Sequence, residues 1–322
     1  MNTNHAQENY KQNKENKMSE IEFKDRVAII TGAGGGLGRS HALALAARGV
    51  KVVVNDLGGS VDGTGSGATM AENVVAEIKA AGGEAIANGA NVTKEDEVDA
   101  MVAQAIEAFG HVDILVNNAG ILRDKSFSKM TLADWKLVVD VHLNGSATCT
   151  KAVWNHMKER GYGRIVMTTS SSGMYGNFGQ TNYGAAKAGL SGFMRTLCLE
   201  GAKYNIRVNT LSPTARSRMT ENLMPEEILE KLTVESVSAG LVYLVCDDAP
   251  NRMILCAGAG GYSETKVFET QGINLSEGEQ TPENVAKFID QIRDIQGQEE
   301  FTNGGQQGTK FLTRIQSGKF AK

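Results

Sequence analysis

Tyr183 and Lys187 lie four positions apart in the stretch YGAAK, which is predicted to be helical. Residues four apart share one face of an α-helix, so the phenol and the amine are expected side by side. A free phenol has a pKa of about 10 and is a poor base at neutral pH. A nearby ammonium group favours the phenolate, and lowering the pKa by about 3 units corresponds to about 4 kcal/mol. The pair is therefore suited to proton transfer.

The spacing of Tyr183 and Lys187 is common by itself, and Ser170 makes it informative. It follows the apolar run RIVMTT, a predicted buried strand, and precedes Tyr183 by 13 positions. Open α/β sheets bind their ligands at the carboxyl ends of strands, where Ser170 is expected to lie. We expect its hydroxyl to hydrogen-bond the reacting oxygen while Tyr183 takes the proton.

A glycine-rich turn, TGAGGGLG (31–38), follows a predicted strand and precedes a predicted helix. Gly32, Gly36 and Gly38, with Leu37 between the last two, allow a sharp turn that brings amide groups and the helix N-terminus to a pyrophosphate. We expect any side chain at Gly36 or Gly38 to obstruct that approach. The strand-turn-helix context predicts a dinucleotide site.

Asp56 ends the second predicted strand, 18 positions after Gly38. Dinucleotide folds place an acidic residue about 20 positions after the glycine turn. Its carboxylate can accept hydrogen bonds from the adenosine ribose and would repel a 2′-phosphate, which favours NAD. Arg39 could attract such a phosphate, so NADP stays open as the less favoured cofactor.

Short apolar runs alternate with longer helical stretches along most of the chain. Strands are predicted at 26–31, 51–55, 84–88, 113–117, 164–169, 206–210 and near 252–257, and helices at 36–48, 69–81, 94–109, 131–160 and 183–204. Buried strands separated by helices are typical of βαβ units, which form a parallel sheet with helices on both faces. This predicts a doubly wound α/β fold.

Composition excludes several other classes. The 322 residues carry a net charge of −4, which disfavours nucleic acid as a partner, and no apolar run approaches the length of a membrane span. The 4 cysteines lack metal-ligand or disulfide-scaffold spacing, so no metal is expected. A soluble cytoplasmic protein is predicted, with a disordered polar leader over 1–22.

The segment 263–322 is polar and rich in Gly and Gln, apart from one predicted helix, TPENVAKFIDQIRDI (281–295). Thr281 and Pro282 suit its start, and one face carries a stripe formed by Val285, Phe288, Ile289, Ile292 and Ile295. We expect a C-terminal extension packed on the main domain (23–262), on a partner subunit or over the active site.

Together TGAGGGLG, NNAG (117–120), Ser170 and YGAAK resemble the short-chain dehydrogenase/reductase family over about residues 24–262. The resemblance implies a Rossmann-like, seven-stranded parallel sheet of order 3-2-1-4-5-6-7, and a homodimer or homotetramer formed through helices 131–160 and 183–204. It also implies that Lys187 grips the nicotinamide ribose, that Asn118 and Gly120 line the cofactor site, and that Asn91 lies near the adenine.

Longer stretches, among them VVVNDLGGSVDGTGSG and GRIVMTTSSSGMYGNFGQTNYGAAK, closely resemble the (3R)-hydroxyacyl-CoA dehydrogenase units of type 2 peroxisomal multifunctional enzymes. This implies NAD-dependent oxidation of (3R)-3-hydroxyacyl-CoA to 3-oxoacyl-CoA. Segments 173–180 and 214–227 are then the expected substrate walls, with Arg216 and Arg218 as candidates for CoA phosphates and Met219, Leu223 and Met224 for an acyl channel. A 3-oxoacyl thioester reductase, a steroid or alcohol dehydrogenase, and a non-catalytic nucleotide sensor stay open as alternatives.

One position departs from the family pattern. Many members carry a catalytic Asn in a V-N-L-x-G stretch, and alignment on Gly145 places His142 there, with Asn144 two positions later. Residues two apart on a helix do not share a face, so the two cannot substitute for one another. His142 is the candidate fourth catalytic residue. It could relay protons, hold a water through its backbone carbonyl, or serve a structural role.

Overall fold

The computed structural model describes residues 20–59, 62, 69–216, 226–318 and 320–321. It divides into two units, one that ends at Glu264 and one that begins at Thr265. The predicted leader up to residue 19 lies outside the described residues. So do four predicted substrate contacts, namely Arg218, Met219, Leu223 and Met224.

The main unit is built on an eight-stranded sheet of order β3-β2-β1-β4-β5-β6-β7-β8. The first seven strands are parallel, which confirms the predicted doubly wound fold and strand order, and β8 pairs antiparallel with β7. The sequence did not predict β8 because its residues, GYSE, are all exposed and show no apolar pattern. The strands are β1 (Val27–Thr31), β2 (Lys51–Asn55), β3 (Ala85–Asn88), β4 (Ile114–Asn117), β5 (Gly163–Thr168), β6 (Ile206–Thr214), β7 (Ile254–Gly258) and β8 (Gly261–Glu264).

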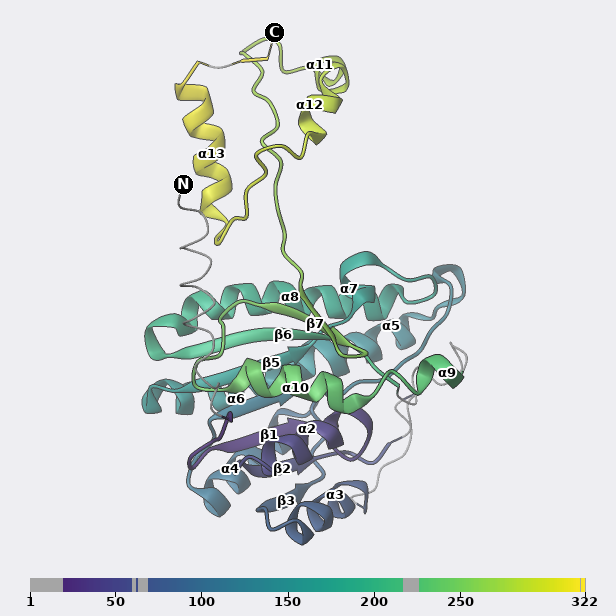
Figure 1. Cartoon of the computed structure of the whole chain (residues 1–322). Helices are drawn as coiled ribbons and strands as arrows, with labels where there is room; N and C mark the ends of the chain where they lie inside the picture. The colour runs from purple at the N-terminus through teal and green to yellow at the C-terminus, as the bar shows by residue number, and fades with distance from the viewer. Residues whose placement is uncertain (1–19, 60–61, 63–68, 217–225, 319, 322) are drawn as a thin grey trace, which may run out of the picture. The chain divides into compact units, whose positions relative to one another are not determined.

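Helices cover both faces of the sheet (Figure 1). One cluster of buried apolar side chains joins the sheet to α2 (Gly36–Ala46), α3 (Thr69–Ala80) and α10 (Val234–Val245). The other joins it to α4 (Glu95–Phe109), α6 (Gly145–Arg160) and α8 (Thr181–Gly201). Successive strand residues point to opposite faces, as Ile29 and Ile30 do. Among the described residues no helix is long and apolar enough to span a bilayer.

The predicted helix 131–160 is interrupted. It forms α5 (Leu132–Val139), a π-helical turn η2 (Asp140–Asn144) and α6. A π-helical turn accommodates one extra residue and often occurs at functional sites. Here it carries the buried side chain of His142. Shorter elements of this unit are η1 (Phe127–Lys129), α7 (Ser171–Tyr175), η3 (Ala202–Tyr204) and α9 (Glu226–Leu229).

In the unit that begins at Thr265, the prediction of a single helix over 281–295 is wrong. The chain forms α11 (Pro282–Lys287) and α12 (Ile289–Arg293), with a break at Phe288, and a further helix α13 (Gly305–Gln316). Thr281 caps α11 as predicted, by accepting from the backbone N–H of Asn284. The apolar stripe does not act as one face, because Phe288 is buried at 7% exposure while Ile295 is 69% exposed.

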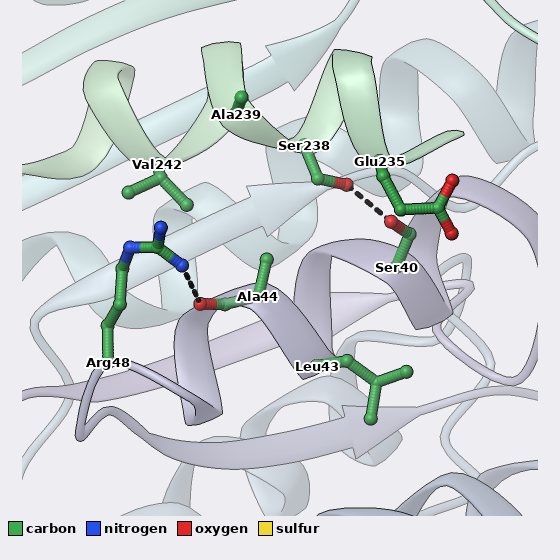
Figure 2. Close-up of a pocket in the computed structure, with 8 residues that line it drawn as sticks. All are labelled: Ser40, Leu43, Ala44, Arg48, Glu235, Ser238, Ala239 and Val242. Carbon is green, nitrogen blue, oxygen red and sulfur yellow. Dashed lines mark hydrogen bonds between the residues drawn. The ribbon is translucent and has the colours of Figure 1, made fainter. Parts of the chain in front are cut away.

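A groove of about 350 Å³ lies between α2 and α10 (Figure 2). Ser40 and Ser238 face each other across it, with 2.7 Å between their hydroxyl oxygens. Behind them the fully buried His41 places Nδ1 2.7 Å from Ser238 Oγ, and its Nε2 has no hydrogen-bond partner among the described residues. Burial lowers the pKa of His41 to about 3, so the ring is neutral. None of the residues that line this groove belongs to the glycine turn, and Ser170, Tyr183 and Lys187 are not among them.

Candidate active site

Three neighbouring strands deliver the predicted site residues to one edge of the sheet. β1 pairs with β4, and β4 pairs with β5, all parallel. The glycine turn follows β1, Asn118 follows β4, and Ser170 comes shortly after β5. Between β1 and β4 the strand order reverses direction, which is where open α/β sheets bind ligands.

Asn118 ties the end of β4 to the glycine turn. Its Nδ2 donates to Thr31 O at 3.0 Å and to Gly32 O at 2.9 Å, and its backbone N–H donates to Thr31 Oγ1 at 3.1 Å. Asn118 thus holds the backbone of the turn, and the prediction that it lines the cofactor site stays a prediction. The role of Thr31 was not predicted from the sequence, although its position at the end of β1 was the available signal.

The glycines of the turn serve different steric purposes. Gly36 has a φ of +51° and open space around the position of a Cβ, so its backbone conformation is what demands glycine. A Cβ at Gly38 would lie 2.2 Å from Gly32 O, which the folded turn does not permit. Within the protein itself, a side chain at Gly36 would contact nothing, whereas one at Gly38 would clash with the backbone of the turn. The predicted obstruction of a pyrophosphate by a side chain at Gly36 or Gly38 stays a prediction.

Asp56 joins the end of β2 to the same turn. Its Oδ2 accepts from Gly34 N–H and its Oδ1 from Gly58 N–H, each at 2.7 Å. Gly34 was not singled out by sequence, although it lies within the GGG run. Arg39, the residue that could have attracted a 2′-phosphate, instead forms a two-pronged ion pair with Glu77 of α3, one bond of which measures 3.1 Å.

Ser170, Tyr183 and Lys187 come together as predicted. The Ser170 hydroxyl lies beside the Tyr183 phenol and lowers its pKa. The Lys187 Nζ lies 5.4 Å from the centre of the Tyr183 ring and donates to Thr168 O at 2.5 Å. Lys187 is buried at 3% exposure, whereas Ser170 and Tyr183 are partly exposed. The phenol of Tyr183 and the hydroxyl of Ser170 thus lie together, with the buried amine of Lys187 close to the phenol ring.

The protein alone does not lower the pKa of Tyr183. Burial raises it, the hydrogen bond with Ser170 lowers it, and the charge of Asp124 raises it further. The lowering of the Tyr183 pKa that we expect from Lys187 together with a positively charged nicotinamide ring stays a prediction. Burial of the phenol is the largest cause of the raised pKa. Burial also lowers the pKa of Lys187 to about 7, so the amine is only partly charged near neutral pH.

His142, and not Asn144, faces the site. Its ring meets the Tyr183 ring edge-on at 5.1 Å between centroids. Its Nε2 lies 2.8 Å from Ile121 O and 3.1 Å from Ile121 N, and donates to the first or accepts from the second according to the tautomer. Nδ1 is buried without a partner among the described residues. Asn144 donates to Asp140 Oδ1 at 2.7 Å instead.

The imidazole of His142 is neutral. Burial, followed by the charge of Lys187, lowers its pKa well below the usual value. The ring also explains Gly120, because a Cβ there would lie 2.3 Å from His142 Cε1. Of the three roles that the sequence left open, the contacts within the protein support the structural one, because the ring holds the backbone at Ile121.

The remaining predicted contacts have partners of their own. Asn91 Oδ1 accepts from the backbone N–H and the hydroxyl of Thr93, at 3.0 and 2.9 Å, so it shapes the turn before α4. Arg216 forms an ion pair with Glu226, which places the charge expected to meet CoA beside a carboxylate.

Comparison with known proteins agrees with this geometry. The short chain dehydrogenase family model matches residues 26–228. Peroxisomal multifunctional enzyme type 2 of Mus musculus is 47% identical over 281 residues, which are 86% of this chain and 38% of the mouse protein. The chain thus spans well under half the length of that relative.

Solved structures give the same assignment. Full-length peroxisomal multifunctional enzyme type 2 from Drosophila melanogaster matches with a TM-score of 0.78 at 36% identity, over 93% of this chain and 51% of that one. A 7α-hydroxysteroid dehydrogenase in complex with NADH and 7-oxo glycochenodeoxycholic acid matches with a TM-score of 0.68 at 30% identity, over 75% of this chain and 96% of that one. The chain therefore belongs to the short-chain dehydrogenase/reductase family, oxidoreductases that act on CH–OH groups with a nicotinamide cofactor.

Proposed function

We propose that the protein oxidises (3R)-3-hydroxyacyl-CoA to 3-oxoacyl-CoA with NAD, and that Tyr183 is the general base. The observation that carries this proposal is that the Ser170 hydroxyl, the Tyr183 phenol and the buried Lys187 amine lie together where β5 ends. Similarity to the multifunctional enzymes over 86% to 93% of the chain supports the choice of substrate.

The residues around the glycine turn fit a dinucleotide. The first amides of α2 lack intrahelical partners by helix geometry, and the turn leaves open space at Gly36 for a pyrophosphate. Asp56 uses one hydrogen bond on each oxygen and keeps further acceptor capacity for the ribose hydroxyls. Glu77 neutralises Arg39, which supports NAD over NADP.

When bound, oxidised nicotinamide accepts the hydride from the carbon that bears the hydroxyl and brings a positive charge near Tyr183. That charge, with Lys187 and the hydrogen bond from Ser170, favours the phenolate against the cost of burial. Tyr183 then accepts the hydroxyl proton, and Ser170 hydrogen-bonds the same oxygen as it becomes a carbonyl. Lys187 additionally holds the nicotinamide ribose in this proposal.

The role of His142 in this scheme is to position. Because its ring is neutral and bonded to Ile121, it fixes the segment that follows NNAG against Tyr183. His142→Asn keeps a side chain that can bond this backbone and should retain turnover, whereas His142→Ala should lose most of it.

The direct test follows NADH absorbance with (3R)- and (3S)-3-hydroxyacyl-CoA thioesters of several chain lengths. Faster oxidation of the R isomer with NAD is expected. Preference for the S isomer would reject the substrate assignment. Preference for NADPH in the reverse direction would instead indicate a 3-oxoacyl thioester reductase, and nucleotide binding without any turnover would indicate a sensor.

A further inference from the structure

Two side-chain amides fasten the first turn of α8, which carries Tyr183, to the segment that follows β4. Gln180 Nε2 donates to Asp124 Oδ2 at 2.6 Å, and Asn182 Nδ2 donates to Arg123 O at 3.3 Å. Next to them the backbone N–H of Lys125 donates to Gly179 O at 2.9 Å. The start of the catalytic helix is therefore held by side chains and backbone alike.

The oxygen of the same Gln180 amide holds the segment that carries Ser170. It accepts from Ser172 Oγ at 2.8 Å and from Asn177 Nδ2 at 3.1 Å. The backbone N–H of Ser172 in turn donates to Ser170 Oγ at 3.2 Å. One planar amide thus connects the Ser170 side and the Tyr183 side of the site, so a displacement of Gln180 changes their separation.

The segment that contains Asp124 is itself anchored to α5. Arg123 and Lys125, its neighbours on either side, bind the two oxygens of Asp134 at 2.9 and 3.1 Å. Thr131, the N-cap of α5, also donates to Asp134 at 2.7 Å. Both neighbouring cations are thus engaged with Asp134 rather than with the Asp124 carboxylate, which bonds Gln180 at the start of α8.

We propose that Asp124 and Gln180 form a positioning bridge that fixes the spacing of Ser170 and Tyr183, with the Asp124 carboxylate held at the start of the helix that carries Tyr183. This proposal rests on the role of Tyr183 as base in the proposed function. It adds two residues that contact neither the reacting atoms nor, in this scheme, the cofactor.

The groups that face Tyr183 come from each element packed against it. Lys187 lies one turn further along α8, His142 comes from η2, Ser170 precedes α7, and Asp124 comes from the loop after β4. His142 is neutral, while Ser170 and a charged Lys187 favour the phenolate. Among these groups, Asp124 disfavours the phenolate because two negative charges repel, and its charge raises the pKa of Tyr183.

Asp124→Asn separates charge from geometry, because the new amide oxygen still accepts from Gln180. Its kcat should stay within about twofold of the parent, while the acidic limb of kcat/KM against pH should move to lower pH by about 0.5 to 1 unit. Asp99→Asn, which removes a carboxylate from an exposed position on α4, is the matched control and should not move that limb.

Gln180→Leu breaks both sides of the bridge at similar volume. Its kcat should fall about tenfold or more, and its KM for NAD should change less than about twofold. Far-ultraviolet circular dichroism of Gln180→Leu, Asp124→Asn and the parent checks that each is folded. A Gln180→Leu protein with parental kcat would overturn the positioning bridge.

A titration without substrate separates this proposal from the proposed function. Tyrosinate formation in the NAD complex is followed by ultraviolet difference spectroscopy, and the Tyr183 signal is taken as the difference from Tyr183→Phe. Asp124→Asn should lower the midpoint of that signal, and an unchanged midpoint would overturn the electrostatic role. If no 3-hydroxyacyl-CoA is oxidised, the substrate assignment fails while this titration still decides the role of Asp124.

Discussion

Replacing Lys187 by Met is expected to abolish turnover and to raise the free energy of unfolding at neutral pH. The amine is buried at 3% exposure, and its pKa falls from 10.5 to about 7 because burial disfavours the charged form. The difference, 10.5 − 7, corresponds to about 4 to 5 kcal/mol of destabilisation of the ammonium form. The charged form of Lys187 therefore costs the fold a large part of a typical free energy of unfolding.

The sign of this effect sets its pH dependence. The folded-state pKa lies below the unfolded one, so the unfolded chain binds more protons between about pH 7 and pH 10.5, and the cost of Lys187 falls as pH rises through that window. It amounts to about 4 kcal/mol at pH 7 and about 2 kcal/mol at pH 9. Met forfeits the hydrogen bond to Thr168 O, worth about 1 to 2 kcal/mol, so a net gain of about 2 to 3 kcal/mol is expected at pH 7 and almost none at pH 9.

Guanidinium unfolding of parent and Lys187→Met at the two pH values measures this difference. Lys151→Met, at an exposed position on α6, is the control whose difference from the parent should not depend on pH. A Lys187→Met protein whose stability relative to the parent is the same at pH 7 and pH 9 would refute the assignment of a costly buried ammonium. A variant destabilised at both values would refute it as well.

Three further outcomes are expected. Tyr183→Phe should reduce turnover by about a thousandfold and leave NAD affinity, measured by fluorescence titration, nearly unchanged; loss of both together would contradict its role as base. Glu77→Gln should release Arg39 and raise the affinity for NADPH relative to NADH by about threefold to tenfold, and an unaltered ratio would speak against Arg39 as the latent phosphate contact. The folded-state pKa of His41 is about 3 and lies below its unfolded value of 6.5. As pH falls below 6.5 the unfolded chain binds a proton at His41 and the folded chain does not, so the free energy of unfolding falls. The parent should therefore lose about 2 kcal/mol more than His41→Leu between pH 7 and pH 5 in denaturant titrations, and equal losses would exclude His41 as the cause.

The sheet was predictable because its strands are buried on both faces and read as unbroken apolar runs. Where an element is neither buried nor periodic the same reasoning fails, as with β8 and its exposed GYSE. The π-helical turn at Asp140–Asn144 was hidden because one extra residue in a helix hardly disturbs its apolar pattern. In the C-terminal unit the stripe over 281–295 was present, but the chain breaks at Phe288.

Within the site, the residues found from sequence are those whose chemistry is unusual for their position, such as Tyr183 and Lys187. Backbone partners escaped notice because any residue type supplies them, as Thr168 O does for Lys187. The direction of the Tyr183 pKa also required the structure, since only burial reveals that Lys187 is partly neutral. The homo-oligomer and the cytoplasmic location stay predictions.

The close approach of Gly120 to His142 ties together two positions from different parts of the chain. With 2.3 Å between a Cβ at 120 and His142 Cε1, the present backbone leaves no room for imidazole at 142 and a methyl group at 120 together. Exchange of both residues can then proceed in one order only: the ring must first give way to something smaller, after which glycine becomes dispensable. The opposite order passes through an overcrowded intermediate, in which the buried ring of His142 must shift.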